Sequence, residues 1–255
     1  MPRRSLSRVA DVTRRACVAA DLRIAGLSKL STVDWPDRLA ATLFLQGCPW
    51  DCFYCHNPAL IAPRAAGALP WEDVDAFLAR RVGLLDAVVF SGGEPTMQAA
   101  LLPALLATRE YGFAVGLHSG GAYPANLSRV LPHVDWIGLD IKAEAVDYAA
   151  VTGRPGSAEN AWRSLKLVLG AVAARASSER PLRYEVRTTV HASAFDEAGL
   201  ARLGHRLADA GVTRWAVQRF RETGARSPLP RVAPRSGVVE LSGLPRERFD
   251  SFTIR

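Results

Sequence analysis

The sequence predicts an α/β fold, a partial (β/α)6 TIM-like barrel with parallel strands in a single domain. Six strand-length apolar runs alternate with longer amphipathic segments, which is typical of a parallel sheet joined by right-handed crossovers. Most runs are continuously apolar, as expected of strands buried on both faces. Polar residues follow each run, where barrels and open α/β sheets place their active sites.

The predicted strands share this apolar character, although the last two carry more polar side chains. They are Leu39–Gly47, Asp86–Phe90, Phe113–Leu117, Trp136–Ile141, Tyr184–Val190 and Arg214–Phe220. The clearest helical segments are Pro70–Val82, Met97–Tyr111, Ala158–Ala174 and Asp196–Ala210. A chain of 255 residues is long enough for one sizeable core of this kind.

We divide the chain into three parts. Residues 23–222 form the predicted core. Residues 1–22 are an Arg-rich leader with little hydrophobic periodicity, which we expect to be flexible or loosely packed. Residues 223–255 are rich in Pro, Gly and Arg, and we expect this C-terminal extension to wrap around the outside of the core.

Composition narrows the classes of protein. The sequence has no run of ~20 apolar residues that could span a membrane and no apolar stretch typical of a signal peptide, so we expect a cytoplasmic protein without membrane contact. The net charge of +7 comes from dispersed arginines, so we expect no nucleic-acid partner. Four cysteines do not suggest a disulfide scaffold, and three of them are clustered, which indicates a metal or cluster site.

The clustered cysteines are Cys48, Cys52 and Cys55, spaced C-x3-C-x2-C directly after the first predicted strand. Three thiolates can ligate three irons of a [4Fe–4S] cluster and leave one iron open, because such a cluster normally takes four cysteines. The alternative is a zinc knuckle that uses His56 as a fourth ligand. An adjacent Cys–His pair seldom directs both side chains to one metal, so the spacing favours the cluster. Cys17 has no second ligand nearby and is interpreted as incidental.

Two glycines and a carboxylate follow the second predicted strand. Gly92 and Gly93 permit close approach of a ligand to the backbone, and Glu94 can accept a hydrogen bond from a ligand ammonium group. Alone, this segment could be an ordinary strand-to-helix turn. The preceding cysteine motif favours ligand binding.

Further polar residues end the remaining strands. Asp140 and Lys142 are two residues apart and point to one face, where they form either a structural ion pair or a binding site for ribose hydroxyls or a carboxylate. Polar side chains also lie at or near the ends of the third, fifth and sixth strands, where they could neutralise a carboxylate or shape a partner site: His118, Ser119, Arg187, Thr189, His191, Arg219 and Arg221.

Across roughly residues 24–221, these motifs resemble the radical S-adenosylmethionine superfamily, whose signature C-x3-C-x-aromatic-C is matched with Tyr54 as the aromatic residue. The resemblance implies a [4Fe–4S] cluster held by the three cysteines, with S-adenosylmethionine on the open iron. It implies that Gly92–Glu94 bind the methionine amino group and that the backbone from Tyr54 to His56 packs against adenine. Further cofactor contacts are assigned on the same basis to Ser119, Asp140, Lys142, His191 and Arg221.

Within the superfamily, the chain is most similar to the glycyl-radical-enzyme activases, in particular the anaerobic ribonucleoside-triphosphate reductase activating proteins. The similar segments are Cys55-His56-Asn57-Pro58, Gly26 to Pro36, Phe44 to Cys48 and Gln218 to Arg221. The resemblance implies reductive cleavage of S-adenosylmethionine and removal of hydrogen from a glycine Cα of a partner enzyme. It also implies a flavodoxin- or ferredoxin-type electron donor.

One departure from the activases concerns the third strand, where His118 stands in place of an aspartate that can help hold a monovalent cation.

Two other functions stay open. One is a radical enzyme acting on a small molecule, similar to the 7-carboxy-7-deazaguanine synthases, whose cluster loops lack the Cys-His-Asn-Pro run. The other is a non-enzymatic zinc-binding interaction module.

Overall fold

A computed structural model describes residues 16–226 and 237–255, so most of the predicted leader 1–22 lies outside the described residues. One sheet runs through the described chain in the order β1 to β8, with β1 antiparallel to β2 and every later pair parallel. The strands are β1 (Ile24–Ser31), β2 (Ala40–Leu45), β3 (Ala87–Gly92), β4 (Ala114–Ser119), β5 (Trp136–Asp140), β6 (Arg183–Val190), β7 (Arg214–Arg219) and β8 (Ser251–Ile254). The six predicted strands correspond to β2 through β7, and the predicted parallel α/β fold is confirmed.

Two strands were not predicted. β1 is an edge strand with mostly half-buried or exposed residues, so its sequence lacks the apolar run that marks a central strand. β8 is four residues long and lies in the extension that was expected to wrap around the outside. Instead, Arg214 to Val217 pair with Ser251 to Ile254, and the extension lengthens the sheet.

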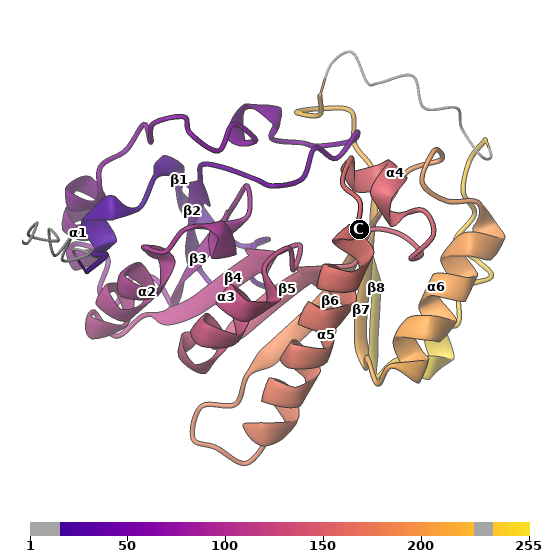
Figure 1. Ribbon diagram of the computed structural model, residues 1–255. Helices are drawn as coiled ribbons and strands as arrows, with labels where there is room; N and C mark the ends of the chain where they lie inside the picture. Colours follow the sequence, from indigo (N-terminus) through magenta and orange to yellow (C-terminus); the bar gives the residue numbers. More distant parts are fainter. Residues whose placement is uncertain (1–15, 227–236) are drawn as a thin grey trace, which may run out of the picture.

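Helices cover the outer face of the curved sheet in chain order (Figure 1). They are α1 (Trp71–Ala79), α2 (Leu101–Glu110), α3 (Pro124–Val130), α4 (Tyr148–Thr152), α5 (Ser157–Ala174) and α6 (Glu197–Asp209). The Asp196 side chain caps α6 by accepting a hydrogen bond of 2.6 Å from the Gly199 N–H. Helix α2 begins four residues later than predicted, because Pro95–Met97 form a separate 3-10 turn.

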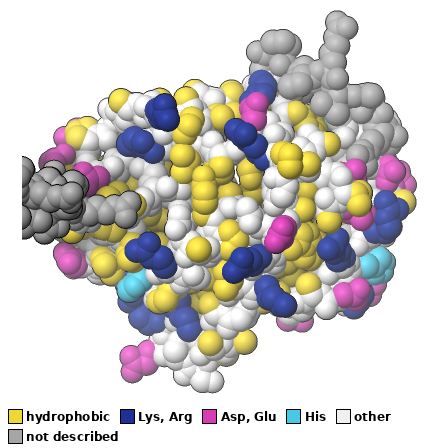
Figure 2. Space-filling model, in the orientation of Figure 1, with side chains coloured by type: hydrophobic (Ala, Val, Ile, Leu, Met, Phe, Trp, Pro, Cys, Tyr) yellow, Lys and Arg dark blue, Asp and Glu magenta, His cyan; other side chains and the backbone are white. Residues whose placement is uncertain are grey.

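Alternation along the strands separates two cores. Residues such as Leu43, Leu117 and Val186 face the helices and belong to the large outer core. The inner face carries a small core at the amino-terminal end of the sheet, where Trp35 stacks on Trp136 with ring centroids 5.5 Å apart. Toward the carboxyl ends of the strands, the residues on the inner face become polar. They surround the site described below. On the outer surface seen in Figure 2, Lys and Arg side chains are dispersed among apolar ones.

Candidate active site

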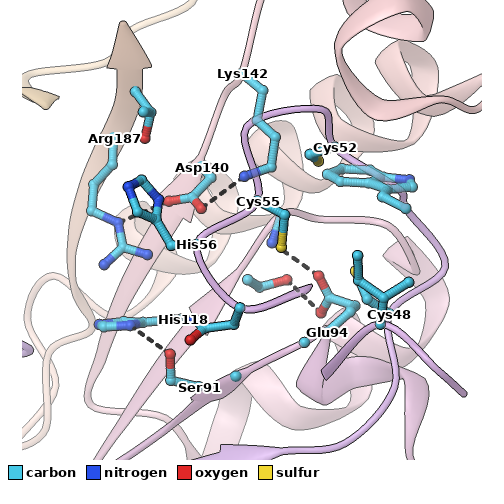
Figure 3. Close-up of a pocket in the computed structure, with 18 of the residues that line it drawn as sticks. Cys48, Cys52, Cys55, His56, Ser91, Glu94, His118, Asp140, Lys142 and Arg187 are labelled. Carbon is cyan, nitrogen blue, oxygen red and sulfur yellow. Dashed lines mark hydrogen bonds and ion pairs between the residues drawn. The ribbon is translucent and has the colours of Figure 1, made fainter. Parts of the chain in front are cut away.

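A cavity of about 410 Å³ lies at the carboxyl ends of the parallel strands (Figure 3). It brings together most of the predicted site residues: Cys48, Cys52, Tyr54, Cys55, His56, Gly92, Gly93, Glu94, Ser119, Asp140 and Lys142. His191 and Arg221 do not line the cavity. The cavity is also lined by residues that were not assigned to it from the sequence: Asp34 from the loop after β1, and Phe44, Ser91 and Gln218 from the strands. Arg187 and Thr189 line it too; the sequence had offered them as groups that could neutralise a carboxylate or shape a partner site.

The cysteine loop begins at a clamp made by Gln46. Its side-chain amide donates hydrogen bonds to the carbonyl oxygens of Ala59 and Ala62, at 3.1 and 3.0 Å. The backbone N–H of Cys48 donates to the Ile61 carbonyl at 3.1 Å. These bonds draw the two ends of the loop together, so the three cysteines project from a closed turn. A polar residue two positions before Cys48, at the end of an apolar run, was the available sequence signal for this role.

The far side of the loop rests on α4 and its flanks. Asp51 N–H donates to the Thr152 carbonyl at 2.9 Å, and Phe53 N–H donates to the Val151 carbonyl at 3.2 Å. The Trp50 ring packs so closely on Gly120 that a Cβ there would lie 2.4 Å from the ring. The loop is therefore held on three sides by other elements.

The C-terminal extension also contacts the loop. The backbone N–H of Arg226 donates to the Cys55 carbonyl at 2.9 Å, and its guanidinium forms an ion pair with Asp51. The His56 Nε2–H donates to the Arg221 carbonyl at 2.9 Å. Arg221 thus contributes a backbone group to the loop, while its side chain is exposed.

Burial sets the protonation state of two of the three thiols. Burial raises the pKa of Cys48 to about 12 and that of Cys52 to about 11, so without a cation these thiols are neutral at pH 7. Bound iron would lower the pKa values of these thiols, because metal coordination stabilises the thiolate.

The arrangement of possible metal donors bears on the zinc knuckle considered from the sequence. Within residues 16–226 and 237–255, no three Cys, His, Asp or Glu side chains converge to hold one metal ion. Cys48, Cys52 and Cys55 nevertheless line one cavity. A zinc knuckle made by the three cysteines and His56 is therefore not preformed among the described residues.

Gly92 and Gly93 are required by the neighbouring backbone. A Cβ on Gly92 would lie 2.3 Å from the Leu45 nitrogen, and one on Gly93 would lie 2.2 Å from the Gly47 oxygen. Gly92 also has φ of 107°, which favours glycine. The glycines therefore let the end of β3 pack directly on β2 and the residues that lead into the cysteine loop. The sequence had predicted a different reason for glycine here, namely close approach of a ligand to the backbone.

Glu94 is 2% exposed and hydrogen-bonded through both carboxylate oxygens. Oε1 accepts from the Thr96 hydroxyl at 2.5 Å, from the Thr96 N–H at 3.2 Å and from the Ser119 hydroxyl at 2.8 Å. Oε2 accepts from the Gly120 N–H at 2.9 Å. Burial raises the pKa of Glu94 above its ordinary value, and the hydrogen bonds oppose that rise. Oε2, with one donor from the chain, keeps capacity for a ligand donor.

Asp140 bridges two cations across the cavity wall. Lys142 Nζ lies 3.0 Å from Oδ2, and Arg187 Nε lies 2.9 Å from Oδ1. Burial alone would raise the pKa of Asp140, but the charges of Arg187 and Lys142 outweigh burial and hold it well below its ordinary value. The ion pair considered from the sequence is present. Arg187 joins it because Asp140 and Arg187 are register partners on β5 and β6.

His118 has both ring nitrogens engaged. Nε2–H donates to the Asp34 carbonyl at 2.7 Å, so Nδ1 accepts from the Ser91 hydroxyl at 3.0 Å. Burial and the nearby charge of Arg187 lower its pKa to about 3, so the imidazole is neutral at pH 7. His118 therefore joins β4 to β3 and to the loop that carries Asp34.

Aromatic rings close the side of the cavity next to β6 and β7. Tyr54 stacks on His191 with centroids 6.4 Å apart, and His191 meets Phe220 edge-on at 4.8 Å. The predicted site residue His191 thus packs behind Tyr54 outside the cavity. On β7, alternation directs Gln218 inward and places Arg219 on the outer face.

Comparisons with known proteins agree with this geometry. Residues 42–173, slightly more than half of the chain, match the sequence profile of the Radical SAM superfamily. The chain belongs to this superfamily of enzymes, which implies a [4Fe–4S] cluster and S-adenosylmethionine as cofactors. No helix of the described residues is both long and apolar enough to cross a membrane.

Two relatives extend the similarity. A Methanocaldococcus jannaschii protein with the provisional name glycyl-radical enzyme activating enzyme is 26% identical over 245 residues, covering 91% of this chain and 95% of that protein. A pyruvate formate-lyase-activating enzyme of Clostridium pasteurianum is 32% identical over 138 residues, covering 52% of this chain and 58% of that protein. These similarities confirm the resemblance to the activases that the sequence motifs indicated.

Solved structures support the fold. Streptococcus suis SuiB bound to S-adenosylmethionine superposes with a TM-score of 0.53 at 14% identity, over 75% of this chain and 42% of that chain. QueE from Escherichia coli superposes with a TM-score of 0.51 at 18% identity, over 79% of this chain and 85% of that chain. At these identities the likeness concerns the fold alone.

Proposed function

We propose that this chain is a glycyl-radical-enzyme activase whose partner is an anaerobic ribonucleoside-triphosphate reductase. The observation that carries the proposal is the single cavity in which three cysteines meet Glu94 and the Asp140–Lys142 pair at the ends of parallel strands. The near full-length similarity to the protein of M. jannaschii supports the activase class. The partner itself is proposed from the sequence motifs around Cys48 and His56.

The residues present fit the implied cofactors. Cys48, Cys52 and Cys55 would hold the [4Fe–4S] cluster, since they surround a common space without converging on one ion. The chemistry supplied by the bound cofactors is reductive cleavage of S-adenosylmethionine, which yields methionine and a 5′-deoxyadenosyl radical that takes hydrogen from a glycine Cα.

The chain's own groups would bind and orient the cosubstrate. Glu94 Oε2 has room for a second hydrogen bond and would accept it from the methionine ammonium group. Lys142 and Asp140 would face ribose hydroxyls or the carboxylate, with Arg187 holding Asp140 ionised. Trp50 and Tyr54 are buried in the wall and would keep water from the reacting centre.

A flavodoxin- or ferredoxin-type electron donor and a cytoplasmic location belong to the same proposal. Both stay predictions, as do the contacts of His191 and Arg221 with the cosubstrate. The proposal that Arg219 and Arg221 help to dock the partner is compatible with their exposed side chains.

The test is anaerobic reconstitution with iron and sulfide, followed by reduction and addition of S-adenosylmethionine and the reductase. We expect a brown protein, 5′-deoxyadenosine, and a glycyl radical on the reductase by electron paramagnetic resonance. Cys52→Ala should abolish both products, while Cys17→Ala, at an exposed cysteine, should preserve them. A colourless zinc protein would contradict the proposal, and cleavage without a radical on any glycyl-radical enzyme would favour a small-molecule substrate.

A further inference from the structure

A second, shallower hollow of about 390 Å³ opens beside the active-site cavity at the β1 edge of the sheet. Ala25 and Gly26 at the start of β1 form one side, and the His56–Leu60 turn forms the other. None of the described residues that line it is Lys, Arg, Asp or Glu. We call it the β1 groove. It is an uncharged surface that leads away from the cysteine loop.

The β1 groove borders the active-site cavity. Phe44, His56 and Asn57 line both spaces, so the two hollows share a wall. Gly26 is the register partner of Phe44, which places the glycine beside this shared wall. Because position 26 carries no side chain, β1 leaves the groove open at this point.

β1 also offers main-chain hydrogen-bonding groups. Among the described residues it pairs along its length with β2 alone, apart from an isolated bridge between Ile24 and Leu69. A free strand edge can add an extended peptide through backbone hydrogen bonds. Leu30 on β1 is 58% exposed and Val33, two residues after the strand ends, is 75% exposed, so apolar side chains are presented at the far end of this edge.

We propose that the β1 groove and the adjoining edge of β1 hold an extended segment of the partner polypeptide, which passes Phe44 to bring its glycine into the cavity. The inference rests on the proposed activase function. An extended main chain fits a shallow uncharged groove beside a free strand edge, and the residues that the groove shares with the cavity place such a chain next to the cysteine loop. A small substrate would enter the cavity without needing this outer surface.

Gly26→Phe tests the inference in the reconstituted holoenzyme. A Cβ at position 26 meets no atom within 4 Å, and Gly26 is not among the glycines with positive φ, so a side chain fits without strain but fills the groove. We expect the rate of glycyl-radical formation on the anaerobic ribonucleoside-triphosphate reductase to fall about tenfold or more. Partner-free formation of 5′-deoxyadenosine should stay within about twofold of wild type, since the cavity is unchanged.

Two further variants complete the experiment. Gly26→Ala should give a smaller loss, because a methyl group fills less of the groove. Gly170→Phe is the matched control: it lies on α5, has the same open surroundings and no positive φ, and should activate the reductase normally. Melting temperatures of all variants report folding.

The outcomes separate the groove from the function. Normal reductase activation by Gly26→Phe would overturn the groove inference and leave the activase function intact. An equal loss of partner-free cleavage would also overturn it, since the groove would then belong to the cosubstrate site. If wild type cleaves S-adenosylmethionine but forms no radical on the reductase, the proposed function fails and the proposed occupant fails with it.

Discussion

The Glu94 carboxylate accepts a hydrogen bond of 2.9 Å from the backbone N–H of Gly120, which ties the end of β3 to the loop after β4. The same carboxylate binds the Ser119 hydroxyl at 2.8 Å. Glu94 is thus both a candidate ligand for the cosubstrate and the link that fixes two neighbouring strand ends.

Replacing Glu94 with Gln tests this double role. The amide NH2 group would face the donors that now point at the carboxylate, so one buried donor pair would be left unmatched. We expect a loss of about 1–3 kcal/mol in the free energy of unfolding. We also expect weaker S-adenosylmethionine binding with the iron content unchanged. Binding titration, denaturant unfolding and iron analysis measure the three quantities, and unchanged affinity would contradict the proposed contact.

Gly93→Ala tests the close packing of β3 on the cysteine loop. The new Cβ would lie 2.2 Å from the Gly47 carbonyl oxygen, so the backbone must move. We expect a loss of about 3 kcal/mol or more and poor cluster incorporation. Gly170→Ala, on an open part of α5, should instead stabilise the protein by about 0.5–1 kcal/mol. A mild effect at position 93 would show that the two segments separate easily.

Asp140→Asn leaves two cations facing a neutral amide. We expect a loss of about 2 kcal/mol, less than for a fully buried pair because the Asp140 side chain is 28% exposed. Adding Lys142→Met should recover part of this stability by removing one unpaired charge. Denaturant unfolding of the single and double variants measures the coupling energy between Asp140 and Lys142. Strictly additive losses in the free energy of unfolding would argue against such a coupling.

The pH dependence of stability should report His118. Its pKa is 6.5 in its ordinary environment and about 3 in the fold, so the unfolded chain takes up a proton first as the pH falls. The stability that His118 contributes is therefore complete above about pH 6.5 and is lost as the pH falls toward 3. His118→Gln keeps a donor for Asp34 but does not titrate. Unfolding measured from pH 8 to 5.5 should show a smaller pH dependence in the variant, and equal dependence would contradict the assignment.

Several features of the site follow from the sequence because they are local. The C-x3-C-x2-C spacing places three thiols on one short loop whatever the surroundings. Central strands such as Val88–Phe90 are marked by continuous apolar runs, and their carboxyl ends lie together in any parallel sheet. The convergence of Cys48, Glu94 and Asp140 on one cavity could therefore be predicted.

Features that depend on partners distant in the chain could not be predicted in this way. Arg187 is 47 residues from Asp140, and only the register of β5 and β6 brings their charges together. The role of Gly93 depends on the oxygen of Gly47, which lies just after β2. Likewise, the weakly apolar β8 forms because β7 offers it a pairing edge.

The amino-acid sequence by itself determined the parallel α/β core and the cysteine loop, because periodicity and spacing act over short segments of chain. Only the tertiary structure decided which polar side chains are buried and already hydrogen-bonded within the protein. It shows that burial and the charge of Arg187 lower the pKa of His118, whose two ring nitrogens are hydrogen-bonded to Asp34 and Ser91. It also places Arg219 outside while Gln218 faces the cavity. Burial and hydrogen bonding depend on packing between distant segments, and only the folded chain brings those segments together.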